Sequence, residues 1–76
     1  MTTSEKIAYI RNSYGLMLKQ SSPEFLYGAY LYSQGLNEAW GLDGSISWQD
    51  QKELAKEIET IYNVCTDKLK GEINLN

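Results

Sequence analysis

The chain contains no histidine, and this absence excludes much of the chemistry that side chains perform in enzymes. Activation of a nucleophile by a Ser-His or Cys-His pair requires an imidazole. The one cysteine, Cys65, has no second thiol for a disulfide, and no Cys-x-x-Cys pair is present to hold zinc. We therefore expect a protein that is not an enzyme and that binds no metal or other cofactor.

Long apolar runs and clusters of basic residues are also missing. No segment approaches the roughly 18 apolar residues of a membrane span, and the first residues lack the apolar stretch of a secretion signal. Seven Lys and Arg residues stand against ten Asp and Glu, a net charge of −3, which disfavours nucleic acid as a partner because phosphate binding depends on cations. Together with the lone thiol, these absences predict a cytoplasmic protein without a membrane partner.

Apolar residues recur at three- and four-residue steps, the spacing of one face of an α-helix, along much of the chain. The predicted helices cover three segments, residues 4–19, 23–40 and 48–70. Ser22 and Pro23 suit the cap and the first turn of the second helix. Gly41 and Gly71 are predicted to end the second and third helices, leaving a short tail. No alternating segment rich in Val, Ile and Thr indicates a strand.

These segments predict an all-α fold in a single small domain, residues 1–76. The second and third helices are expected to form an antiparallel hairpin because their connection is short. The first helix would pack across this hairpin or be exchanged between two copies. A domain of this size obtains only ~3–5 kcal/mol from a single core, which favours a homodimer.

The connection before the third helix, Asp-Gly-Ser-Ile-Ser, resembles the middle of an EF-hand calcium loop. The resemblance places Asp43 at the fifth position of that loop and Asp50 at the twelfth. Its first and third positions then fall on Ala39 and Gly41, which have no side-chain oxygen for calcium. The competing interpretation, which we adopt, is a tight turn at the Asp-Gly pair followed by Ser47 as the cap of the third helix.

Six Tyr, two Trp and one Phe are more aromatic side chains than a three-helix domain of 76 residues can bury. Tyrosine and tryptophan dominate protein interfaces because each offers a large rigid surface with a polar tip. Tyr27 and Leu31 point away from the stripe of the second helix that faces the other helices. Together with carboxylates that attract a basic partner, the predicted partner-binding residues are Tyr27, Tyr30, Leu31, Trp48, Glu53, Glu57 and Glu59.

The sequence therefore predicts a non-catalytic protein-protein interaction module, a small regulator or adaptor whose partner is another protein. Its size and acidity are typical of phage and mobile-element accessory proteins that modulate a host factor. Two alternatives stay open. One is a dimeric nucleic-acid-binding regulator in which Lys6, Arg11 and Lys19 of the first helix contact phosphate. The other is a purely structural homo-oligomer.

Overall fold

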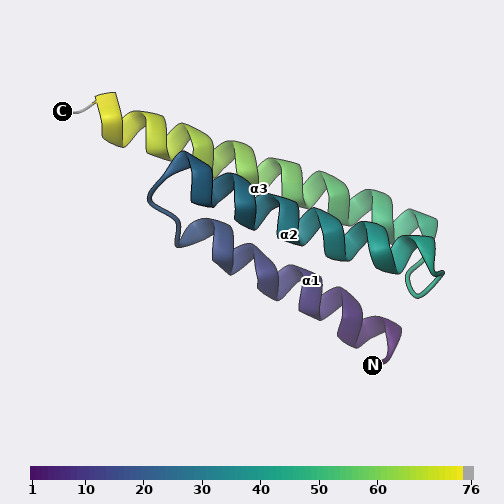
Figure 1. Ribbon diagram of the computed structural model, residues 1–76. Helices are drawn as coiled ribbons and strands as arrows, with labels where there is room; N and C mark the ends of the chain where they lie inside the picture. Colours follow the sequence, from purple (N-terminus) through teal and green to yellow (C-terminus); the bar gives the residue numbers. More distant parts are fainter. Residues whose placement is uncertain (75–76) are drawn as a thin grey trace.

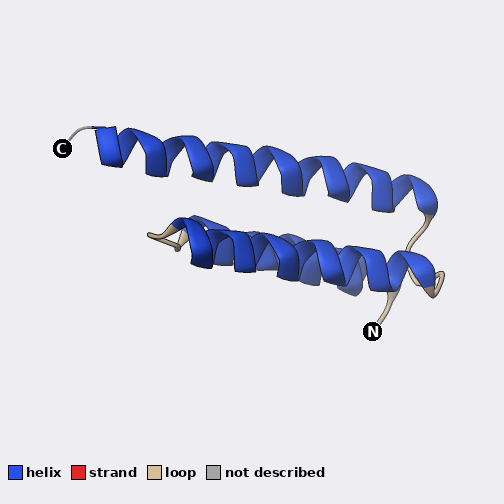
Figure 2. Ribbon diagram, turned by 45° about the horizontal axis from the view of Figure 1, so that its top comes forward, coloured by secondary structure: helices blue, strands red, loops and turns tan. Residues whose placement is uncertain are grey.

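The computed structural model describes residues 1–74 and the side chains of residues 1–71, and in that range it contains three helices and no strand (Figures 1 and 2). The helices are α1 (Thr3–Leu18), α2 (Pro23–Leu42) and α3 (Trp48–Asn74). The predicted all-α fold of three helices is confirmed. Figure 1 shows α2 beside α3 and running in the opposite direction, which is consistent with the predicted hairpin. None of the helices in the described range has both the length and the apolarity of a membrane span.

The first two helices begin at the caps that their sequences indicate. The hydroxyl of Thr2 accepts a hydrogen bond from the amide of Glu5 at 3.1 Å, and the carboxylate of Glu5 accepts from the amide of Thr2 at 2.8 Å. This reciprocal pair is a complete capping box. Ser22 caps α2, and Pro23 occupies its first turn, where a missing amide hydrogen costs nothing.

The connection between α2 and α3 is a turn, as predicted. Its Asp43 accepts a hydrogen bond from the amide of Ser45 at 2.8 Å. Gly44 has a φ of 80°, the only positive φ in the described chain, and this conformation favours glycine. Ser47 then caps α3, since its hydroxyl accepts from the amide of Asp50 at 3.0 Å.

Two predicted helix ends are wrong, because α2 continues past Gly41 and α3 continues through Gly71. The amide of Asp43 still donates to a carbonyl four residues back at 3.1 Å, so the helical hydrogen bonds persist beyond Gly41. A Cβ at this position would meet only the end of the flexible Gln51 side chain of α3, which can move aside. Of the predicted tail after Gly71, residues 75–76 lie outside the described residues.

The core lies between the three helices and takes one stripe of side chains from each. Two polar contacts cross it: the hydroxyls of Ser13 and Ser33 are 2.6 Å apart and join α1 to α2, and Asn37 donates to the carbonyl of Gln51 at 3.0 Å and joins α2 to α3. Such pairing offsets the cost of burying polar groups. The buried apolar residues are Ile10, Tyr14, Met17, Leu26, Ala29, Ile46, Leu54, Ile58, Cys65 and Leu69.

Candidate interaction surface

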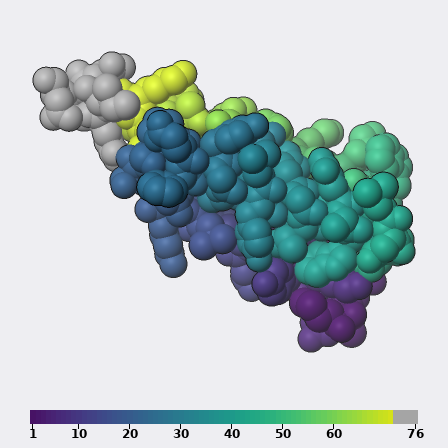
Figure 3. Space-filling model, viewed as in Figure 1, coloured from purple at the N-terminus to yellow at the C-terminus, as the bar shows by residue number. Residues whose placement is uncertain are grey.

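The outward side of α2 carries more large exposed apolar side chains than either of the other helices in the described chain. Leu42 is 88% exposed, Phe25 72% and Tyr27 51%. In Figure 3 the blue to teal atoms of α2 run across the front of the molecule. We define the α2 face as the exposed residues Phe25, Tyr27, Gly28, Leu31, Tyr32, Gly35, Ala39 and Leu42.

Charge is nearly absent from the α2 face. Glu24 and Glu38 are the only charged residues of α2, and residues 25–37 between them contain none. Gly28 and Gly35, two helical turns apart, are both exposed, and a Cβ added at either would meet nothing within 4 Å. Each glycine costs about 0.5–1 kcal/mol of helix stability relative to alanine, and no contact inside the chain requires it. The two glycines leave the backbone of α2 open to close approach from outside.

Two of the predicted partner-binding residues, Tyr27 and Tyr30, form an aromatic cluster with Tyr62, and a third, Leu31, lies on the α2 face. Tyr27 and Leu31 lie on the face itself, about half exposed. Tyr30 is half-buried between α2 and α3, its ring centroid 4.3 Å from that of Tyr62 and 6.0 Å from that of Tyr27. The hydroxyl of Tyr30 donates to the carboxylate of Glu59, and this hydrogen bond raises the pKa of the tyrosine. Tyr30 and Glu59 therefore hold Tyr27 in place.

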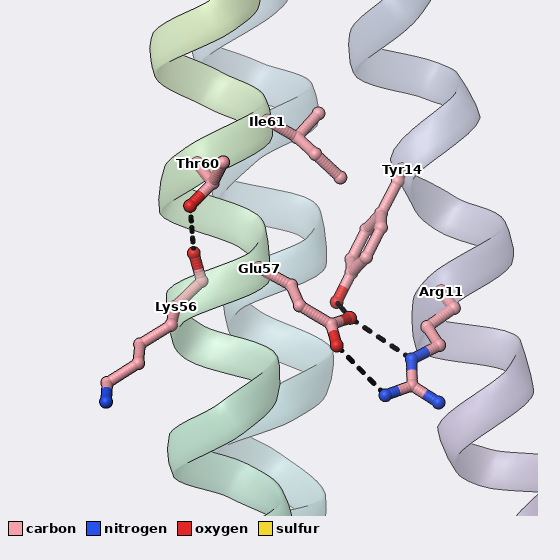
Figure 4. A pocket seen from close by; sticks show the side chains of 6 residues that line it. All are labelled: Arg11, Tyr14, Lys56, Glu57, Thr60 and Ile61. Carbon is pink, nitrogen blue, oxygen red and sulfur yellow. Dashed lines mark hydrogen bonds and ion pairs between the residues drawn. The ribbon is translucent and has the colours of Figure 1, made fainter.

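The remaining predicted residues do not lie on the α2 face. Trp48 is 72% exposed at the start of α3. The exposed carboxylate of Glu53 accepts a hydrogen bond from Gln49 of the same helix at 3.1 Å. Glu57 points toward α1 (Figure 4). The structure thus places Tyr27, Tyr30, Leu31 and Glu59 on or next to the α2 face and leaves Trp48, Glu53 and Glu57 elsewhere.

Sequence analysis missed Phe25, Tyr32 and Leu42. The signal was present, because Phe25, Gly28, Tyr32 and Gly35 recur at the three- and four-residue steps of one helix face. Two of these four positions are glycines, so the sequence pattern alone did not indicate an apolar helix face. The exposure of Phe25 and Tyr32 in the structure does.

A groove lies between α1 and α3. Arg11 donates to the two carboxylate oxygens of Glu57 at 3.1 and 2.9 Å, and the hydroxyl of Tyr14 donates to the same carboxylate at 3.1 Å (Figure 4). The hydrogen bond from Arg11 holds the pKa of Glu57 below its usual range, whereas burial raises the pKa of Tyr14. These three side chains border a cavity of about 500 Å³ together with Lys56, Thr60 and Ile61.

The groove continues one turn further along both helices. A second cavity of about 210 Å³ lies there, lined in part by Leu18, Val64 and Lys68. Leu18 is 63% exposed and Val64 58%, so apolar walls stand open to solvent. We call the two cavities together the α1–α3 groove.

The cations of α1 do not gather on one surface. Lys6 donates to the hydroxyl of Ser45 at 2.6 Å and lies 5.7 Å from the ring centroid of Trp40. Arg11 is paired with Glu57 on the side of α3. The arrangement therefore adds no support to phosphate binding by these residues.

Comparisons of this chain with models of protein families, with curated proteins and with solved structures found no match, so its interpretation rests on its own residues.

Proposed function

We propose that this protein is a non-catalytic interaction module, a small regulator or adaptor that binds another protein through the α2 face. The observation that carries the proposal is the exposure of five large apolar side chains on a helix without charge from residue 25 to residue 37. Removing apolar surface from water stabilises a complex by about 25 cal/mol per Å². Aromatic residues are also the most frequent energetic centres of interfaces.

Two of the aromatic anchors are already held in position before a partner arrives. Tyr27 packs against Tyr30, with nearly parallel rings at an interplanar angle of 25°. The hydroxyl of Tyr32 is 3.4 Å from that of Tyr9 on α1. Side chains that are ordered beforehand lose less conformational entropy on binding, which favours docking on a preformed helix face.

The same proposal includes self-association as one use of the α2 face and a cytoplasmic location. The location is supported by the single cysteine, whose thiol is buried and unpaired. Proteins of reducing compartments keep their thiols in this state.

The proposal is tested by affinity capture from nuclease-treated lysate of the source cells, with mass spectrometry of the retained proteins. Leu31→Lys places a charge at the centre of the α2 face. We expect this variant to retain at least about fivefold less of the specific partner, the effect of roughly 1 kcal/mol.

The matched control is Ala8→Lys, which adds the same side chain to an exposed position of α1. It is expected to capture the partner as the wild type does. Equal capture by Leu31→Lys and the wild type would remove the α2 face from the proposal.

A further inference from the structure

We infer that α2 pairs with α2 of a second copy of this chain, side by side and in opposite directions, so that two copies form a symmetric dimer. The inference rests on the proposed function, because it names a second copy as a partner of the α2 face. It depends on a row of exposed residues that repeats along α2. We call this row the α2 seam, and its residues are Phe25, Gly28, Tyr32, Gly35, Ala39 and Leu42.

The spacing of the α2 seam is typical of a helix that packs along another helix. Its residues follow one another in strictly alternating steps of three and four, a repeat of about 3.5 residues that keeps one row of side chains against a neighbouring helix over several turns. None of the six residues is charged, and all six are exposed. No helix of the same chain covers this row, so a second helix has to come from another molecule.

The order of large and small residues along the seam gives the direction of the second helix. In an antiparallel pair, Tyr32 of each copy lies opposite Gly35 of the other, where the missing side chain leaves room for the ring. This match sets the other levels, which pair Phe25 with Leu42 and Gly28 with Ala39.

A parallel pair would be packed less evenly. Each residue would then lie opposite the same residue of the second copy, so that two rings of Tyr32 meet at one level and two Gly35 residues at the next. Crowded and empty levels would alternate along the contact, and both overpacking and voids cost free energy. The seam therefore favours the antiparallel pair, in which every glycine has a larger residue opposite.

The exposed area matches a small dimer interface. The large residues of the seam, Phe25, Tyr32 and Leu42, and the neighbouring Leu31 together expose about 500 Å² per copy, if a large side chain has roughly 200 Å². Two copies then bury about 1,000 Å², the size at which specific interfaces begin. A short peptide would cover only part of this row, whereas a second α2 has the length to cover all of it. We expect a dimer that dissociates on dilution.

The seam lies on the side of α2 that faces α1. Tyr32 approaches Tyr9 of α1 there, and both residues line a cavity of about 280 Å³ together with Leu16. Tyr27 lies on the other side, where its ring contacts that of Tyr62 on α3. Pairing along the seam therefore leaves Tyr27 exposed, so a dimer keeps a surface for another protein.

Such an interface is isologous, since the same residues of both copies meet, and it is complete with two copies. The wild type should therefore change from monomer to dimer as its concentration rises and form no larger species. Sedimentation velocity from micromolar to millimolar concentration measures this change.

Gly35→Leu is the variant that tests the seam. It fills the space that Tyr32 of the second copy requires, and we expect it to weaken dimerisation at least about tenfold. Position 35 is helical and a Cβ there meets nothing within 4 Å, so the variant should keep the helical content of the wild type, which circular dichroism checks. A face that associates only because it is apolar would instead dimerise more tightly. Ala8→Leu, which adds the same side chain at an exposed position of α1, should dimerise like the wild type.

A spin label at Glu24→Cys, in a chain that also carries Cys65→Ala, reports the direction of the pair. In the antiparallel pair, position 24 is level with position 43 of the second copy, so the two labels should be about 30 Å apart at 1.5 Å of rise per residue. In a parallel pair they would lie at one level, within about 20 Å of each other across neighbouring helices. Pulsed electron paramagnetic resonance of the dimer measures this distance.

Several outcomes would overturn the inference: a wild type that stays monomeric up to millimolar concentration, assembly beyond a dimer, a Gly35→Leu variant that dimerises as tightly as the wild type, or labels at one level. Failure of the proposed function is distinct, since Leu31→Lys would then capture the same proteins from lysate as the wild type. A monomeric wild type whose capture of another protein is lost in Leu31→Lys would keep the proposed function and remove only the dimer.

Discussion

At the scale of single residues, the partly exposed carboxylate of Glu57 on α3 links that helix to α1 through hydrogen bonds. Arg11 binds both of its oxygens, and Tyr14 adds a third hydrogen bond. The side chains of Arg11 and Glu57 are 52% and 38% exposed, so solvent screens their attraction. An ion pair of this kind contributes about 0.2–1 kcal/mol to stability.

Glu57→Gln is expected to lower the unfolding free energy by less than about 1 kcal/mol at neutral pH. Because Arg11 lowers the pKa of Glu57 in the folded chain, the stabilisation is fully present above the unfolded pKa, near 4.5, and is lost as the pH falls through the lower folded value. The difference between wild type and variant should therefore shrink toward zero in acid. Urea unfolding at neutral pH and at about pH 3 measures both differences.

Glu53→Gln is the matched control, since the carboxylate of Glu53 accepts its hydrogen bond from Gln49 of the same helix. It is expected to change the unfolding free energy less than Glu57→Gln does. If Glu57→Gln lowers the unfolding free energy equally at both pH values, the stabilisation does not come from the ion pair with Arg11.

At the scale of helices, the starts could be predicted from the sequence and the ends could not. The hydroxyls of Thr2, Ser22 and Ser47 each bond an amide three residues ahead, so their effect is local and visible in a short stretch. Gly41 was wrongly predicted as a stop because glycine permits a left-handed end without imposing one, and the helical hydrogen bonds of α2 continue past it to the amide of Asp43.

The same distinction applies to the candidate surface. Tyr27 and Leu31 could be placed on an exposed face because the periodicity of their own helix decides which way they point. The partner of Glu57 could not be predicted, since Arg11 lies 46 positions away in the sequence and on another helix. Contacts between helices depend on their packing, and the pattern of one helix carries no information about the side chain opposite.

Gly28→Ala and Gly35→Ala are each expected to raise the unfolding free energy by about 0.5–1 kcal/mol. Both positions are helical, and the added methyl group meets nothing within 4 Å. The same substitutions should weaken the binding that the α2 face supports, because they hinder close approach of a partner. Urea unfolding of dilute protein gives the first effect, and sedimentation velocity gives the second.

Gly44→Ala provides the control of opposite sign, since the φ of 80° at Gly44 strains any residue with a Cβ. This variant should be less stable than the wild type. If the alanines at positions 28 and 35 stabilise the fold and leave association unchanged, the two glycines have no part in the interface.

At the scale of the whole molecule, one core holds three helices in a body 46 Å long and less than half as wide. Ile58 is fully buried in that core, and Leu42 is 88% exposed at the end of α2. Because all three helices share the core, we expect them to unfold together.

Ile58→Ala is expected to lower the unfolding free energy by about 2–5 kcal/mol through loss of apolar contacts and the cavity left behind. That loss approaches the entire stability of a domain of this size, so the variant should be largely unfolded near room temperature. Circular dichroism and tryptophan fluorescence during urea unfolding measure the change, and their transitions should coincide. As the control, Leu42→Ala should have the unfolding free energy of the wild type because Leu42 is exposed. An Ile58→Ala variant as stable as the wild type would contradict a single shared core.

The two short connections, residues 19–22 and 43–47, have a consequence for the kinetics of folding. Helices that follow each other in sequence also pack against each other, so little chain entropy is lost before the first contacts form. Proteins dominated by such local contacts fold in microseconds to milliseconds. Once α3 has also left the ribosome, the chain would therefore complete its core within a small fraction of the time needed to add one residue during synthesis.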